Sequence, residues 1–152
     1  MGRRRIFEND DSVQVQPPLP ITSIRDLGKI VEWHGGQRTV WMRRAVEEAV
    51  ESGEDPPHRA GPLPDSKPVP LRLCRGTYDR AYGAAGRCGH VRGDDDRAMP
   101  ARWIRDVLVD RIAIEIKAMD KATGAVLKRM ISESPEIKAE IARVMGSGDP
   151  QG

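Results

Sequence analysis

The residue types best suited to hold a metal ion lie in and near the stretch GRCGHVRGDDD, residues 86–96. Cys74, Cys88 and His90 are its weak zinc-ligand candidates, since thiolate and imidazole are ligands that zinc prefers. Thirteen residues separate the two cysteines, however, whereas structural zinc sites have four ligands and commonly use Cys-x-x-Cys pairs. A fourth ligand would have to come from elsewhere: His58, Asp79 or one of the aspartates 94–96. The spacing therefore predicts no tightly bound metal and no cofactor, and favours two thiols in or near a small core.

Patterns typical of catalytic sites are missing from the sequence. It contains no Gly-x-Ser-x-Gly, no Walker loop and no His-Glu-x-x-His. The histidines, His34, His58 and His90, fall in three different segments. A nucleophile pair of Cys88 and His90 would still need a third group to orient it. We therefore expect that the protein is not an enzyme.

Residues 22–53 are predicted to form two helices joined by Gly35-Gly36, which is the outline of a helix-turn-helix. The second helix begins with QRTVWMRR, and a recognition helix reads DNA with its N-terminal residues. The candidates for base and phosphate contacts in it are Gln37, Arg38, Thr39, Arg43 and Arg44. Residues 1–52 carry eight basic and eight acidic residues, however, while strong DNA binders concentrate positive charge on one face. A plain helical hairpin packed on the C-terminal helices is the alternative.

A second basic stretch runs from residue 72 to residue 92 and holds five arginines against one acidic residue. Tyrosines and glycines are interleaved with the arginines, and a flexible chain of this composition suits phosphate contact and base stacking. The candidate nucleic-acid contacts here are Arg75, Arg80, Arg87 and Arg92. A solvated loop without any ligand would have the same composition.

Apolar residues at helical spacing predict an all-α fold of about four to five helices. Helices are expected over residues 23–34 and 38–52, and along the C-terminal segment 99–146. The C-terminal segment should carry most of the apolar contacts, with Leu108 in the core. Alternation in RIAIEIK, residues 111–117, leaves a strand as the alternative at that point.

The rest of the chain is predicted to be irregular. Six prolines in residues 53–73, followed by glycine-rich and arginine-rich sequence, predict a long loop over residues 54–98. Residues 1–21, with their basic tip and the PPLP motif, are expected to be a disordered lead, and residues 147–152 a disordered tail.

Composition limits the classes of protein that fit. The 152 residues make one ordinary domain or two very small ones, and the net charge is only +2. Two cysteines are too few for a disulfide scaffold and fit a reducing compartment. No apolar run approaches the ~20 residues of a membrane span. We expect a cytoplasmic protein with no membrane partner.

These observations lead to two functional hypotheses. The first is a small helical protein that binds nucleic acid and regulates transcription, acting with a larger protein machine. The alternative is a structural or assembly subunit that uses its helices only for protein–protein contacts. Under either hypothesis the C-terminal helices are expected to pair two chains or to bind a protein partner.

Overall fold

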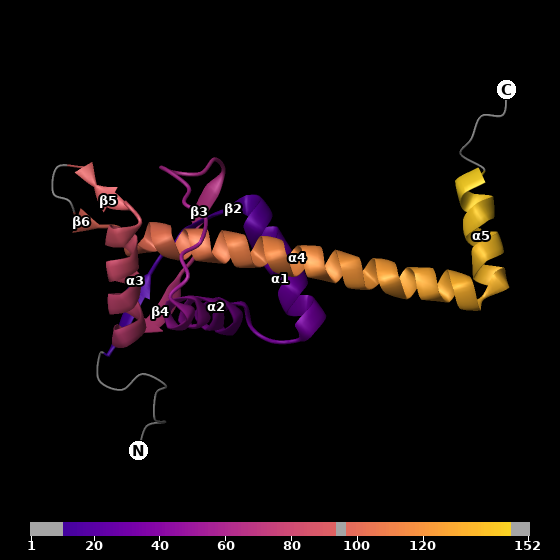
Figure 1. The fold of residues 1–152 in the computed structure, drawn as a ribbon, viewed down its shortest axis with the longest axis horizontal. Helices are drawn as coiled ribbons and strands as arrows, with labels where there is room; N and C mark the ends of the chain where they lie inside the picture. Colours follow the sequence, from indigo (N-terminus) through magenta and orange to yellow (C-terminus); the bar gives the residue numbers. More distant parts are fainter. Residues whose placement is uncertain (1–10, 94–96, 147–152) are drawn as a thin grey trace, which may run out of the picture. The chain divides into compact units, whose positions relative to one another are not determined.

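The computed structural model describes residues 11–93 and 97–146, and these residues are mainly helical (Figure 1). The chain divides into two compact units, Met1–Glu115 and Ile116–Gly152. The described helices are α1 (Ile21–His34), α2 (Arg38–Ser52), α3 (Arg75–Arg87), α4 (Pro100–Glu133) and α5 (Pro135–Gly146). The described strands are β1 (Ser12–Val15), β2 (Pro18–Pro20), β3 (Ser66–Pro68), β4 (Leu71–Cys74), β5 (Val91–Arg92) and β6 (Arg97–Ala98).

Helices α1 and α2, joined by a turn at Gly35-Gly36, lie where the sequence predicts two helices. Gly35 follows α1 with φ of +70°, and Gly53 follows α2 with φ of +70°. A positive φ is one that glycine adopts without steric cost, so each glycine ends its helix where the sequence predicts. Helix α1 begins two residues earlier than expected, and Ser23 is buried inside it instead of capping it.

The described residues also form three short antiparallel strand pairs, so the fold is mainly helical but not purely all-α. Strand β1 pairs with β4, with Val13 opposite Leu73 and Val15 opposite Leu71. Strand β2 pairs with β3, and β5 pairs with β6. Leu71 and Leu73 of β4 are buried and Arg72 between them is exposed, as expected for a strand, in which successive side chains point to opposite faces. Each strand has only one partner, so the prolines of β2 and β3 lie in edge strands, where they are tolerated.

Two predicted irregular segments are therefore wrong in part. Strands β1 and β2 lie where a disordered lead was expected, and β3, β4, β5 and β6 lie inside the expected loop. Residues 1–10, the aspartates 94–96 and the tail 147–152 lie outside the described residues.

Helix α3 is a second correction to the loop predicted over residues 54–98. Its buried residues are Thr77, Ala81, Ala84 and Ala85, which recur at helical spacing on one face. Its three glycines obscured that pattern, because each glycine in a helix interior costs about 1 kcal/mol relative to alanine. Packing of α3 against α2 and β4 outweighs this cost.

Helix α4 settles the helix-or-strand alternative for residues 111–117 in favour of helix. Its buried residues run only from Trp103 to Ile112. No residue of 113–146 is buried. The expectation that the C-terminal segment carries most of the apolar contacts is therefore wrong: its buried residues all lie within 103–112, and most buried apolar residues of the described chain lie outside α4.

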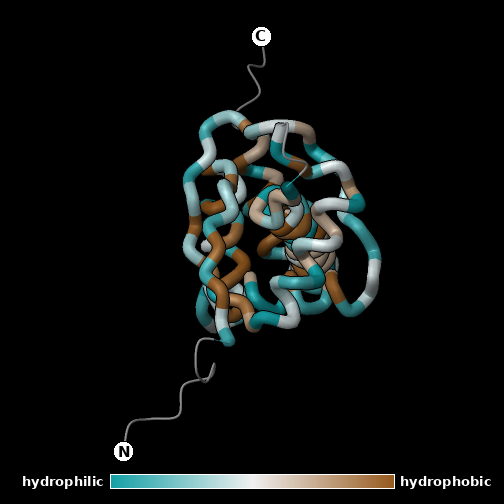
Figure 2. Tube along the Cα trace, turned by 90° about the vertical axis from the view of Figure 1, so that its left-hand side faces the viewer, coloured by the Kyte–Doolittle hydropathy of each residue, from teal (hydrophilic) through white to brown (hydrophobic). Residues whose placement is uncertain are grey.

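The core of the first unit combines residues from helices and strands. Its largest fully buried apolar side chains are Trp103, Leu19, Leu27, Ile30, Met42, Leu71, Leu73, Ile104, Leu108, Ile112 and Val46. In Figure 2, hydrophobic stretches, in brown, alternate along the chain with hydrophilic stretches in teal. Among the described helices, none combines the length and the apolar composition needed to cross a lipid bilayer.

Candidate functional site

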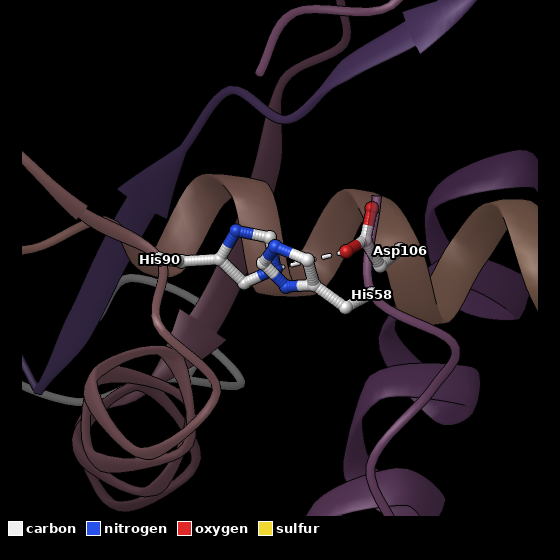
Figure 3. Close-up of side chains that lie close together, drawn as sticks. All are labelled: His58, His90 and Asp106. Atoms are coloured by element: carbon white, nitrogen blue, oxygen red, sulfur yellow. Dashed lines mark hydrogen bonds and ion pairs between the residues drawn. The ribbon is translucent and has the colours of Figure 1, made fainter. Parts of the chain in front are cut away.

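Three side chains that could ligate a metal meet in the first unit, and each comes from a different segment (Figure 3). His58 lies between α2 and β3, His90 between α3 and β5, and Asp106 on α4. One ligand atom from each lies within 4.8 Å of the others. His90 and Asp106 are buried and His58 is exposed. The two imidazole rings lie with their centroids 4.3 Å apart and their planes tilted by 31°.

The Asp106 carboxylate accepts four hydrogen bonds. Its Oδ1 receives Nε and Nη2 of Arg105, at 3.0 and 2.9 Å. Its Oδ2 receives Nε2 of His90 at 2.8 Å and the backbone N–H of Arg59 at 3.1 Å. Both Arg105 and Asp106 are completely buried. A buried carboxylate needs such partners, because burial of an unpaired charge is very unfavourable.

Arg105 also holds the proline-rich segment that carries His58. Its Nη1 donates to the carbonyl of Gly61 and its Nη2 to the carbonyl of Arg59, both at 2.6 Å. Four prolines in residues 56–64 keep this segment from forming a regular ladder, so its partly buried carbonyls need donors from elsewhere. Arg105 supplies those donors and fixes the backbone on either side of Ala60.

His90 is positioned by the end of α3. Its backbone N–H donates to the carbonyl of Ala85 at 2.8 Å, and its carbonyl accepts the N–H of Met99 at 2.7 Å. Gly89, just before it, has φ of +82°, which turns the chain. Burial lowers the pKa of His90, and the nearby Asp106 carboxylate opposes that shift without cancelling it. His90 is therefore a neutral imidazole near pH 7, with Nε2–H donating to Asp106.

This lowered pKa predicts how stability changes with pH. The folded state binds the His90 proton less tightly than the unfolded state, whose histidine pKa is about 6.5. The contribution of neutral His90 to the free energy of unfolding is therefore fully present above about pH 6.5, and it is lost as pH falls through the lowered pKa of the folded state. Urea unfolding in chelator at pH 7.5 and pH 5 should show a smaller loss of stability for His90→Gln than for the parent. Exposed His34 gives the control, and equal losses in parent, His90→Gln and His34→Gln would contradict the prediction.

The predicted zinc candidates are not brought together. Cys74 precedes α3 and Cys88 follows it, and a helix of 13 residues spans roughly 20 Å. The Cys74 Sγ lies 3.1 Å from Oγ1 of Thr77. Burial raises the pKa of the Cys88 thiol, which lies beside Asp55, so this thiol is a weak nucleophile. The His90 ring is bound to Asp106 and not to Cys88.

The candidate nucleic-acid contacts of α2 are placed unequally. Gln37, Arg38 and Thr39 are exposed at its N-terminal end. Arg43 instead donates from Nε to the carbonyl of Arg72, at 3.2 Å. Arg44 is exposed and lines a cleft of about 430 Å³ between α1, α2 and the first half of α4. Four of the five candidates of α2 are therefore exposed, and Arg43 is bonded to the backbone of β4.

The candidates in the second basic stretch lie on a helix and not on a flexible loop. Arg75, Arg80 and Arg87 are exposed on α3, and Arg92 is exposed on β5. Arg87 forms two hydrogen bonds with Asp55, at 2.8 and 3.3 Å, and holds the pKa of that carboxyl below its usual range. The positive charge of this stretch is thus reduced at Arg87.

Sequence analysis missed Arg105 and Asp106, although it considered His58 and His90. The signal was present in WIRDVLV, residues 103–109, where two adjacent charged residues interrupt an apolar helical run. Charged residues are almost never fully buried unless they are paired. Such an interruption on the buried face of a helix therefore predicts a buried ion pair.

Comparison with family models, curated proteins and solved structures finds no match to this chain. Its function has to be argued from its own residues.

Proposed function

We propose that this protein is an assembly subunit that pairs with a second copy of itself through the second half of α4. The observation that carries the proposal is the exposure of the apolar residues in the second unit. Met130 and Leu127 are each nearly half exposed, and Val126 is 56% exposed. Isolated helices gain little stability in water, and most helices in proteins are stabilised by packing an apolar face. A partner surface would supply that packing.

The spacing of a stripe of five residues along this part of α4 favours another helix as the partner. Ile116, Met119, Thr123, Val126 and Met130 follow one another at intervals of three, four, three and four residues. This is the heptad pattern of coiled coils, in which the residues at these core positions of one helix insert between residues of a second helix. Lys121 and Lys128 lie opposite this stripe, where they would remain in solvent.

Charges beside the stripe favour an antiparallel pair. Glu115 and Arg129 occupy equivalent flanking positions two heptads apart. In an antiparallel pair, Glu115 of each copy would oppose Arg129 of the other, giving two attractive contacts, with one repulsive contact between the two Asp120 side chains. Within its own chain Glu115 is also bonded, through Oε1, to His34 at 2.7 Å. A parallel pair would oppose Glu115 and Asp120 twice, and like charges destabilise such contacts. The second copy is therefore complementary to this surface in one orientation.

Sedimentation velocity of the full chain over a hundredfold range of concentration tests the proposal. The parent should form dimers, and Val126→Glu should be monomeric, because it places a charge in the apolar stripe. Ala125→Glu is the matched control, since it adds the same charge one residue away, outside the stripe. Arg129→Glu should weaken the dimer, and adding Glu115→Lys to it should restore the association.

A parent that stays monomeric, or an Ala125→Glu variant that dissociates as fully as Val126→Glu, would overturn the proposal. The nucleic-acid hypothesis would then come first, supported by the exposed Gln37, Arg38 and Thr39 at the start of α2. Binding of duplex DNA that weakens as salt rises would be its signature. It ranks second because α2 buries Met42, Ala45, Val46 and Ala49, which leaves little of the helix to enter a groove.

A further inference from the structure

We propose that His58, His90 and Asp106 form a binding site for a divalent transition-metal ion, with Zn²⁺ as its preferred occupant. Two imidazoles and one carboxylate are a ligand set used by zinc enzymes and by non-haem iron proteins. This site does not depend on the proposed assembly, because all three residues belong to the first unit.

The distances fit an ion after small adjustments. In a tetrahedral zinc site the ligand atoms lie about 3.3 Å apart, given metal–ligand bonds of about 2.0–2.1 Å. The 2.8 Å between His90 Nε2 and Asp106 Oδ2 would open by about 0.5 Å. The longest separation, at most 4.8 Å, would close by about 1.5 Å. His58 is exposed, so its ring can turn toward the ion without disturbing the core.

The surroundings orient the ligands as metal sites require. Arg105 binds Oδ1 of Asp106 and leaves Oδ2 facing the imidazoles. The backbone N–H of Arg59 donates to Asp106, which places the neighbouring His58 against the carboxylate. Such outer partners fix the orientation of ligands in known metal sites. The ring proton of His90 would move from Nε2 to Nδ1, so that the Nε2 lone pair faces the ion.

The same surroundings limit the affinity. The guanidinium of Arg105 offsets the negative charge of Asp106, so the ion gains less attraction than from an unpaired carboxylate. Only three protein ligands are present, and the exposed side of His58 leaves a coordination position for water or a small anion. We therefore expect reversible binding that is weaker than in a closed four-ligand structural site.

Calorimetric titration of the chelator-stripped full chain with Zn²⁺ tests the site. The parent should bind one ion per chain, and His58→Gln should lower the affinity at least tenfold. His34→Gln is the matched control: His34 is also a partly exposed histidine bonded to a carboxylate, Glu115, but it lies outside the cluster. This variant should bind as the parent does.

Cobalt substitution separates this site from one built on the cysteines. The Co²⁺ form of the parent should lack the sulfur-to-metal charge-transfer band that a bound thiolate produces. Circular dichroism of His58→Gln should match that of the parent, so that lost binding is not mistaken for unfolding. Absence of binding by the parent, unchanged affinity in His58→Gln, weakened affinity in His34→Gln or a thiolate band would each overturn the proposal.

Discussion

Replacing Arg105 with alanine should lower the free energy of unfolding by about 3–5 kcal/mol. The substitution leaves the completely buried Asp106 without its positive partner and removes two of the four hydrogen bonds to its carboxylate. It also leaves the carbonyls of Arg59 and Gly61 without the donors that Arg105 provides. Removal of one partner from a buried pair is this costly because the remaining charge cannot be hydrated.

Urea unfolding of the parent and of Arg105→Ala measures this loss, and Arg111→Ala is the matched control. Arg111 lies on the same helix and forms an ion pair with Glu48 at 3.2 Å, but its side chain is 41% exposed. Exposed pairs of this kind contribute about 0.2–1 kcal/mol. If the two substitutions lower the free energy of unfolding equally, Arg105 does not hold the proline-rich segment on α4.

Elements with a local signal could be predicted from the sequence. Helices α1 and α2 follow from apolar residues at helical spacing, and Gly35 and Gly53 mark their ends. Helix α3 was missed because glycines interrupt its alanine face. The pairing of β1 with β4 joins residues about sixty positions apart, such as Ser12 and Cys74, and no local pattern encodes such a pairing.

The candidate metal site was only partly predictable for the same reason. His58 and His90 are evident as ligand types in the sequence, but their partner is Asp106 and not Cys74 or Cys88. The three segments meet because Arg105 binds the proline-rich segment to α4 and because Gly89 turns the chain after α3. Both causes are tertiary, so the spacing of ligand types along the chain does not show that His58, His90 and Asp106 meet.

The second large effect concerns the boundary between the buried and exposed parts of α4. Leu108→Ala should cost about 2–5 kcal/mol, because Leu108 is completely buried and its truncation leaves a cavity in the core of the first unit. Leu127→Ala makes the same chemical change nineteen residues further along the same helix, where the side chain is 49% exposed. It should change stability by less than about 0.5 kcal/mol, in part because alanine favours helix more than leucine does.

The comparison holds for the free chain, so unfolding is measured below the concentration at which the parent associates. Above that concentration, association of folded chains adds to the apparent stability. Leu127 lies beside the apolar stripe of α4, so Leu127→Ala should then lose part of that added stability. Leu108→Ala should instead be destabilised to the same extent at every concentration, because its cavity lies in the core of each copy. Equal effects of the two substitutions in dilute solution would mean that residues near 127 are buried in the free chain, and the case for a partner helix would fail.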